Sequence, residues 1–154
     1  MSEIHIRQAT LLDSATIADF NSRMAWETEH RRLDPDRVQK GVTALLNDSS
    51  KGTYFIAESD DSIVGQLLIT FEWSDWRNGT FWWIQSVYVT ENFRGRGVFR
   101  SLFQHVQKLA KESRDVCGLR LYVEGGNDGA QGTYTRLGMK RTSYEIFETD
   151  FVMG

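Results

Sequence analysis

An arginine- and glycine-rich loop separates a strand pattern from a long helix pattern in the second half of the chain. The strand is predicted over Phe81–Thr90, and Val98–Glu112 carries apolar residues along one helical face. Between them stands the sequence Arg94-Gly95-Arg96-Gly97. A helix start has unpaired N–H groups and the positive end of the helix dipole, and glycines let the backbone approach an anion. The segment therefore predicts a phosphate-binding loop, with a glycine-rich turn carrying solvated arginines as the alternative.

Periodicity in the rest of the chain places this strand–loop–helix unit inside a mixed α/β domain. Three consecutive strand patterns end at the loop, and Asn78-Gly79 between the second and third is a strong hairpin signal. The order of elements favours a mixed α/β layer fold over a doubly wound alternation. The other strands are predicted over Ile4–Ala9, Tyr54–Glu58, Ile63–Trp73, Leu119–Glu124 and Thr142–Val152, and the other helices begin near Ser14, at Pro35 and within 125–129.

Composition narrows the class of protein. The 154 residues suffice for a single domain over residues 1–154 without disulfides. A formal net charge of −3 argues against a nucleic-acid partner, which needs a basic face. The apolar runs are too short to span a membrane, and the start lacks a signal-peptide core. Cys117 is the single cysteine, which favours a reducing, cytoplasmic setting, and its spacing from the histidines predicts no metal site.

The loop and a later segment match two motifs in a fixed order. The first has the pattern Arg/Gln-x-x-Gly-x-Gly/Ala, in which Arg94 and Gly97 match and Phe99 replaces the usual small residue. The second, Asn-x-x-Ala-x-x-x-Tyr-x-x-x-Gly, is matched by Asn127, Ala130, Tyr134 and Gly138. With these motifs nearly the whole chain resembles the GNAT superfamily of acetyl-CoA-dependent N-acetyltransferases. The resemblance implies an α+β fold with a mostly antiparallel twisted sheet of about six or seven strands, about four flanking helices, and splayed fourth and fifth strands.

The resemblance also implies acetyl-CoA as co-substrate, with no metal, and assigns residues to it. Backbone groups of the segment Val87-Tyr88-Val89, chiefly of Val87 and Val89, are expected to pair with the pantetheine arm. Asn127 is expected to hydrogen-bond that arm, and Tyr134 to lie near the thioester sulfur. The residues expected to hold the pyrophosphate are Arg94, Gly95, Arg96, Gly97, Val98 and Phe99.

Acetyl transfer to an amine needs a polarised carbonyl, a proton for the leaving thiolate and a base for the amine. A strand N–H near Val87 is a candidate oxyanion donor, and Tyr134 is the candidate general acid. Two carboxylates are candidate general bases. A two-residue turn at Asn78-Gly79 would place Glu72 opposite Gln85, beside the expected acetyl group, and Glu124 would end the next parallel strand. Solvated strand-end carboxylates are the alternative for both.

The acceptor site is expected between the first two helices. Trp26, Glu27 and Glu29 suit a cationic amine through an aromatic face and carboxylates, and Gln85 is a further candidate contact. A solvated helix end is the alternative reading of the first three. The aromatic hairpin 73–79 is interpreted as a lid over this site or as a homodimer contact.

Two further functions compete with an N-acetyltransferase acting on a small-molecule or peptide amine in a ternary complex. A catalytically silent acyl-CoA-binding sensor or interaction module would keep the same cofactor loop. A nucleotide-phosphate binder is disfavoured, because no Lys-Ser/Thr follows the glycines and the Rossmann alternation is missing. The identity of the amine is left open by the sequence.

Overall fold

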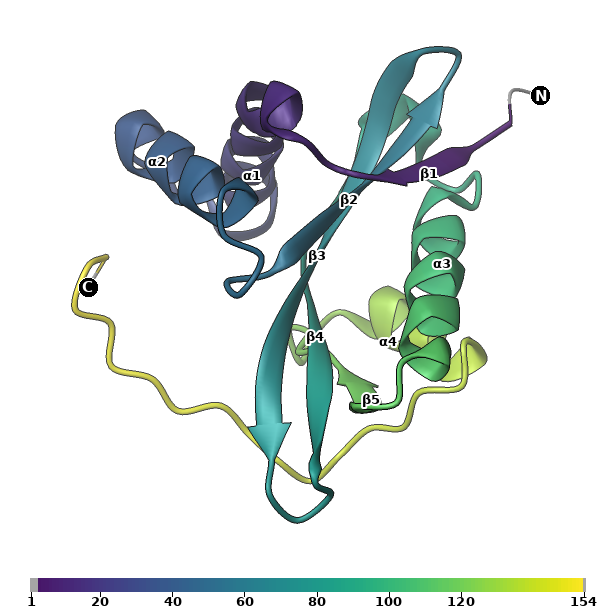
Figure 1. Cartoon of the computed structure of the whole chain (residues 1–154). Coiled ribbons are helices and arrows are strands. Elements are labelled where there is room, and N and C mark those ends of the chain that lie inside the picture. The colour runs from purple at the N-terminus through teal and green to yellow at the C-terminus, as the bar shows by residue number, and fades with distance from the viewer. Residues whose placement is uncertain (1–2, 154) are drawn as a thin grey trace. The chain divides into compact units, whose positions relative to one another are not determined.

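The structure, a computed structural model, describes residues 3–153. The chain divides into two compact units, Met1–Leu121 and Tyr122–Gly154, and each is described by itself. The first unit contains a five-stranded sheet in the order β1-β2-β3-β4-β5, drawn in Figure 1. Its strands are β1 His5–Gln8, β2 Thr53–Ser59, β3 Ser62–Ser74, β4 Gly79–Val89 and β5 Val116–Arg120. The first three pairings are antiparallel and β4–β5 is parallel, which confirms the mixed α/β class.

Helices cover both faces of this sheet (Figure 1). On one face, Ile17 of α1 (Ser14–Glu29) and Val42 of α2 (Pro35–Leu46) pack in one cluster with Leu68 of β3. On the other face, α3 (Val98–Glu112) brings His105 to 5.4 Å between ring centroids from Phe55 of β2. Successive side chains of a pleated strand point to opposite faces, so alternate residues pack into the two cores on either side of the sheet. Among the helices of residues 3–153, none has both the length and the apolar character needed to cross a membrane.

The β3–β4 hairpin turns differently from the prediction. Ser74 pairs with Gly79, so residues 75–78 form the turn, and Asn78 alone supplies a left-handed φ of 49°. Gly79 is the first residue of β4, where an added Cβ would meet the Cys117 Cβ at 2.9 Å. The missing Cβ of Gly79 therefore lets β5 approach closely, and the residue does not form part of a two-residue turn. The two-residue turn lies instead at Asp60-Asp61 between β2 and β3, where both φ angles are positive.

This longer turn corrects the predicted register. Glu72 pairs with Phe81, and Gln85 pairs with Leu68. The prediction that Glu72 stands opposite Gln85 is therefore wrong by four positions, which is about 13 Å along a strand. The physical reason is that turn length sets the register of a hairpin.

Strands β4 and β5 pair over only part of their length. Their parallel register runs from Thr80 opposite Val116 to Trp83 opposite Arg120. β5 ends at Arg120, whereas β4 continues to Val89. The last residues of β4 therefore lie beyond the β4–β5 pairing, as expected for strands that splay apart. β5 also starts and ends earlier than the predicted Leu119–Glu124, so Glu124 is not a strand residue.

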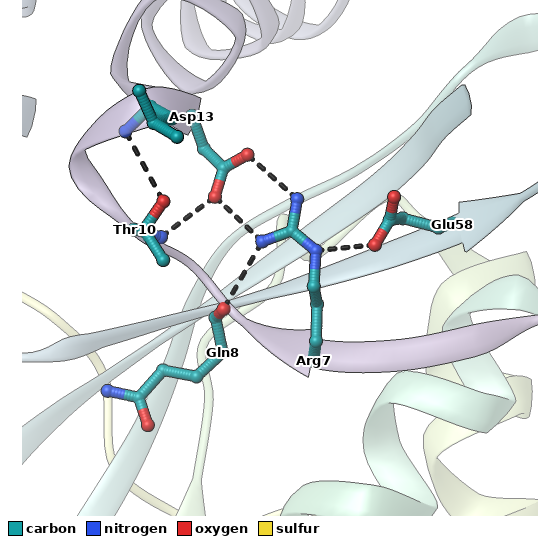
Figure 2. A network of polar contacts seen from close by, with 6 residues as sticks. Arg7, Gln8, Thr10, Asp13 and Glu58 are labelled. Carbon is teal, nitrogen blue, oxygen red and sulfur yellow. Dashed lines mark hydrogen bonds and ion pairs between the residues drawn. The ribbon is translucent and has the colours of Figure 1, made fainter. Parts of the chain in front are cut away.

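A polar network fastens β1 to the start of α1 (Figure 2). The Arg7 guanidinium donates two parallel hydrogen bonds to the Asp13 carboxylate, both 2.8 Å, and a third to Glu58 of β2. The Thr10 N–H also donates to Asp13 at 2.8 Å. Asp13 is 5% exposed, and its hydrogen bonds from the Arg7 guanidinium hold its pKa below the ordinary value.

The second unit contains α4 (Asp128–Arg136) and an extended tail. The tail prediction, a strand over Thr142–Val152, is wrong: the described residues 140–153 contain no strand. An extended segment becomes a strand only when its N–H and C=O groups pair with a neighbouring strand. The hydrogen bonds of the tail are instead local, such as Tyr144 N–H to Thr142 Oγ1 at 3.3 Å. The described residues therefore contain five strands rather than the expected six or seven.

Candidate active site

The predicted phosphate loop joins β4 to α3 through a short 3-10 turn, η2 (Glu91–Phe93). Gly95 and Gly97 have left-handed φ angles of 76° and 82°, which a residue with a Cβ rarely adopts. Gly97 is the N-cap of α3 and offers no side-chain cap to the first turn. The positive end of the helix therefore meets a loop with two arginines, and this arrangement suits a phosphate group.

Phe99 stands where the first motif has a small residue. It lies in the first turn of α3, and its ring centroid is 6.0 Å from that of Phe103, which is 1% exposed. The two rings are one helical turn apart, so the Phe99 side chain packs along the helix. The larger side chain at this motif position is thus accommodated by an aromatic contact within α3.

Strand β4 brings Val87, Tyr88 and Val89 next to this loop. Tyr88 is 7% exposed, and its ring centroid lies 5.0 Å from that of Phe20 in α1. Its side chain thus belongs to the core, and a cofactor would meet the backbone of this segment. Burial raises the pKa of the Tyr88 phenol, and the nearby Glu27 carboxylate adds to the effect.

Glu27 and Arg94, predicted for the acceptor and the pyrophosphate respectively, form an ion pair. Arg94 Nη2 lies 3.1 Å from both Glu27 carboxylate oxygens, and Arg94 Nε donates to the Val89 carbonyl at 2.9 Å. The side chains of Arg94 and Glu27 are 46% and 38% exposed, so solvent weakens their attraction. The end of α1 is therefore connected to the phosphate loop.

The other predicted acceptor residues lie in the last turns of α1, which ends at Glu29. Trp26 contacts its own neighbours: the His30 ring stacks edge-on at 5.4 Å, and the Arg32 guanidinium lies 4.5 Å from the indole centroid. Glu29 is exposed. Gln85 is occupied within the sheet, where its side-chain amide donates to Thr70 Oγ1 at 2.6 Å.

Glu72 is held by a cation and an indole. Its Oε1 accepts hydrogen bonds from Arg120 Nη1 at 2.7 Å and from Trp83 Nε1 at 3.2 Å. The Arg120 guanidinium also lies 3.7 Å from the centroid of the Phe81 ring. Together with its place near the hairpin end of β3, this pairing gives Glu72 a role in joining β3, β4 and β5.

The second unit carries three predicted site residues. Asn127 is the N-cap of α4, and its Oδ1 accepts the Ala130 N–H at 3.0 Å. Tyr134 lies within α4, and burial raises the pKa of its phenol. Glu124 lies in the loop before α4, where its carbonyl accepts the Asn127 N–H at 3.0 Å. Within residues 3–153, no group of His, Cys, Asp and Glu is arranged to hold a metal ion.

The sequence reasoning missed a buried polar network beside the site. Gln66 of β3 is 0% exposed, and its Nε2 donates to Ser86 O in β4 and to Asn21 Oδ1 in α1. Asn21 in turn donates to the Tyr54 hydroxyl. A single glutamine within the otherwise apolar run 63–69 was the available signal, since a buried polar side chain needs partners.

The model of the Acetyltransferase (GNAT) family matches residues 13–139. The chain is 26% identical over 122 residues to a mycothiol acetyltransferase of Corynebacterium aurimucosum, covering 77% of this chain and 40% of the relative. It is 28% identical over 126 residues to a streptothricin acetyltransferase of Escherichia coli, covering 82% of this chain and 68% of that protein. The chain thus spans less than half of the mycothiol relative's length.

A solved structure gives the same result at the level of the fold. The crystal structure of a possible acetyltransferase from Clostridium difficile 630 superposes with a TM-score of 0.89 at 44% identity, covering 97% of this chain and 98% of the other. Together with the glycine loop between β4 and α3 and the partial β4–β5 pairing, these matches identify an acyltransferase domain. The chain belongs to the Acetyltransferase (GNAT) family, whose members use acetyl-CoA as co-substrate.

Proposed function

We propose that this chain transfers the acetyl group of acetyl-CoA to a primary amine by direct attack in a ternary complex. The observation that carries the proposal is the course of β4. Its last residues extend beyond the β4–β5 pairing and lead directly into the glycine loop at the positive end of α3. The free edge of β4 suits an amide-containing arm, and the loop suits a pyrophosphate, so the two features fit the two ends of one ligand.

The cofactor contacts follow from this arrangement. Backbone groups of Val87 and Val89 bind the pantetheine arm, and the loop from Arg94 to Phe99 binds the pyrophosphate. Asn127 uses its Oδ1 to cap α4, so its side-chain NH2 group is the donor toward the arm. Acetyl-CoA supplies the activated acyl group, and the residues of the chain bind and orient it.

Two proton transfers complete the reaction. Tyr134 protonates the departing thiolate: its phenol, whose pKa burial raises, carries its proton at neutral pH. Glu124 accepts a proton from the amine, directly or through a water. Glu72 is the weaker candidate for this base, since the register places it far from Gln85 and Arg120 neutralises it.

The acceptor is a small-molecule or peptide amine with a positive charge in its free form. Glu29 at the end of α1 supplies an exposed carboxylate, Glu27 supplies a second one that it shares with Arg94, and Trp26 supplies an aromatic face. We also propose a homodimer, supported by exposed apolar side chains of the tail and hairpin, and a cytoplasmic location, supported by the single cysteine.

A thiol-release assay tests this function. The chain is incubated with acetyl-CoA and a panel of amines that includes polyamines, amino acids, aminoglycosides and peptides with free N-termini, and free CoA is measured over time. Thiol release that depends on one class of amine supports the proposal. Cofactor binding by calorimetry without thiol release across the panel favours the catalytically silent acyl-CoA sensor.

A further inference from the structure

Strand β4 contains a bulge beside the residues proposed to hold the cofactor. Gln66 pairs with Tyr88 and Leu68 pairs with Gln85, so Ser86 and Val87 together stand opposite the single residue Leu67. Ser86 has a left-handed φ of 48°. A residue with a side chain enters this conformation at a cost, and a bulge keeps one backbone amide out of the ladder. The surroundings must therefore hold Ser86 in place.

The buried network of Gln66, Asn21 and Tyr54 supplies that hold. Gln66 Nε2 donates at 3.0 Å to the Ser86 carbonyl, the carbonyl of the strained residue itself. The same nitrogen donates at 2.9 Å to Asn21 Oδ1, and Asn21 Nδ2 donates at 3.1 Å to the Tyr54 hydroxyl. Gln66, Tyr54 and Asn21 are 0%, 4% and 9% exposed, so water competes little for these bonds. The bulge is thus tied to β2, β3 and α1 at once.

The orientation of the Gln66 amide follows from its two acceptors. Both donors of Nε2 are used, whereas Gln66 Oε1 is buried without a hydrogen-bond partner among the described residues. An unpaired buried acceptor is unfavourable, and a flipped amide would place an oxygen against the Ser86 carbonyl and Asn21 Oδ1, two acceptors. The need to donate to both the Ser86 carbonyl and Asn21 Oδ1 therefore fixes the side chain.

We propose that Gln66, supported by Asn21 and Tyr54, is the positioning residue that aims the β4 amide at the bulge toward the reacting carbonyl. The inference rests on the proposed function and adds to it the oxyanion donor expected from the sequence, a backbone N–H near Val87. Such a donor acts only when it is pre-aligned, and a misplacement of about 1 Å can cost about 100-fold in rate. Gln66 touches neither substrate nor cofactor and acts through Ser86.

The test compares Gln66→Met with Ser59→Ala. Methionine keeps the length of the side chain and removes both donors, whereas Ser59, 3% exposed in β2 and with an unpartnered hydroxyl, controls for loss of another buried polar group. We expect Gln66→Met to lower kcat at least tenfold while the Kd for CoA changes less than about twofold. Amide exchange over residues 85–89 should accelerate in this variant and stay unchanged in Ser59→Ala.

Tyr54→Phe provides a second variant, which removes the hydroxyl that accepts from Asn21 Nδ2 and also interacts with Ser86, and it should lower kcat by about threefold. A folded Gln66→Met with unchanged kcat overturns the inference, and so does a CoA affinity that falls in step with kcat. If Gln66→Met does not fold, an unchanged kcat in Tyr54→Phe overturns it. A wild-type chain without thiol release overturns the proposed function and, with it, this role. An active wild-type chain with unchanged kcat in the variants overturns only the role of Gln66, so the two failures can be told apart.

Discussion

At the scale of single residues, Tyr134 combines a motif position with an environment that suits an acid. Burial raises the pKa of its phenol above the ordinary value of 10.0, so the group stays protonated through neutral pH. A proton donor must hold its proton until the thiolate leaves. The phenol thus has both the chemistry and the protonation state that the proposed step requires.

We expect Tyr134→Phe to lower kcat about 100-fold with little change in the Kd for CoA, because only the proton donor is removed. Glu124→Gln should also lower kcat, because it removes the proposed base, whereas Glu72→Gln should leave kcat nearly unchanged. Tyr144→Phe, an exposed tyrosine of the tail, serves as the matched control. An unchanged kcat in Tyr134→Phe would contradict the general-acid role.

Asp13 makes the stability of the fold depend on acid. Its folded-state pKa lies below the ordinary 3.8, chiefly because of hydrogen bonds from Arg7, so its stabilising effect is complete above the unfolded pKa. That effect is lost as the pH falls through the folded pKa. Asp13→Asn should lower the free energy of unfolding by about 2 kcal/mol at pH 7 and should show a smaller further loss between pH 5 and 3. Urea unfolding at both pH values measures this, and equal acid losses in the two proteins would contradict it.

At the scale of elements, the sequence predicted the segments better than their partners. Caps and apolar periodicity predicted the helices that begin near Ser14, at Pro35 and at Val98. This works because a helix buried on one face needs apolar residues with a period of 3.6. The β3–β4 register escaped prediction because it depends on the backbone of Asn78 and on contact between Gly79 and β5. Neither feature is visible in a local pattern.

Part of the candidate site could likewise be predicted from the sequence, and part could not. The phosphate loop is contiguous in the chain, so its strand, glycines and helix could be interpreted together. The network behind β4 joins Asn21, Tyr54, Gln66 and Ser86, residues that only the folded sheet brings together. The tail had strand composition, but composition does not supply the neighbouring strand with which a strand must pair.

The loop element offers a matched pair of glycine variants. An added Cβ at Gly97 or at Gly41 of α2 would meet nothing within 4 Å, but only Gly97 has a left-handed φ, of 82°. Gly97→Ala should therefore lose about 1 kcal/mol of stability and bind CoA about tenfold more weakly, because the loop must change its path. Gly41→Ala should gain about 0.5 kcal/mol and leave the affinity unchanged. Thermal unfolding and calorimetry test both, and equal CoA affinities would contradict the role of the Gly97 conformation.

At the scale of the whole molecule, the tail leaves large apolar side chains in solvent. Tyr144, Phe147 and Phe151 are 73%, 93% and 95% exposed, and together they present roughly 500 Å² of aromatic surface. Large apolar side chains exposed along one segment often mark an interface. We propose a second copy of the chain as the partner, because the tails of both copies would then bury their aromatic surface together. A stable interface needs about 800 Å² on each side.

Sedimentation should therefore give a mass near twice the 17.7 kDa of one chain. Phe147→Asp combined with Phe151→Asp should give the mass of one chain, because charges replace the apolar contact. Glu145→Gln, an exposed polar position in the same tail, should keep the dimer. A wild-type chain that sediments as a monomer at high micromolar concentration would rule out this assembly.

The link from Tyr54 through Asn21 and Gln66 to Ser86 also has a consequence for how the sequence can change over time. Tyr54, Asn21 and Gln66 are joined through side-chain atoms, so a single replacement among these three leaves a buried group unpaired, whereas Ser86 accepts through its backbone carbonyl. A second replacement at the neighbouring position can restore the pairing. We therefore expect the sites of Tyr54, Asn21 and Gln66 to be strongly epistatic: related proteins should exchange them in compensating combinations, and drift at any one of them should be blocked until its neighbour has changed.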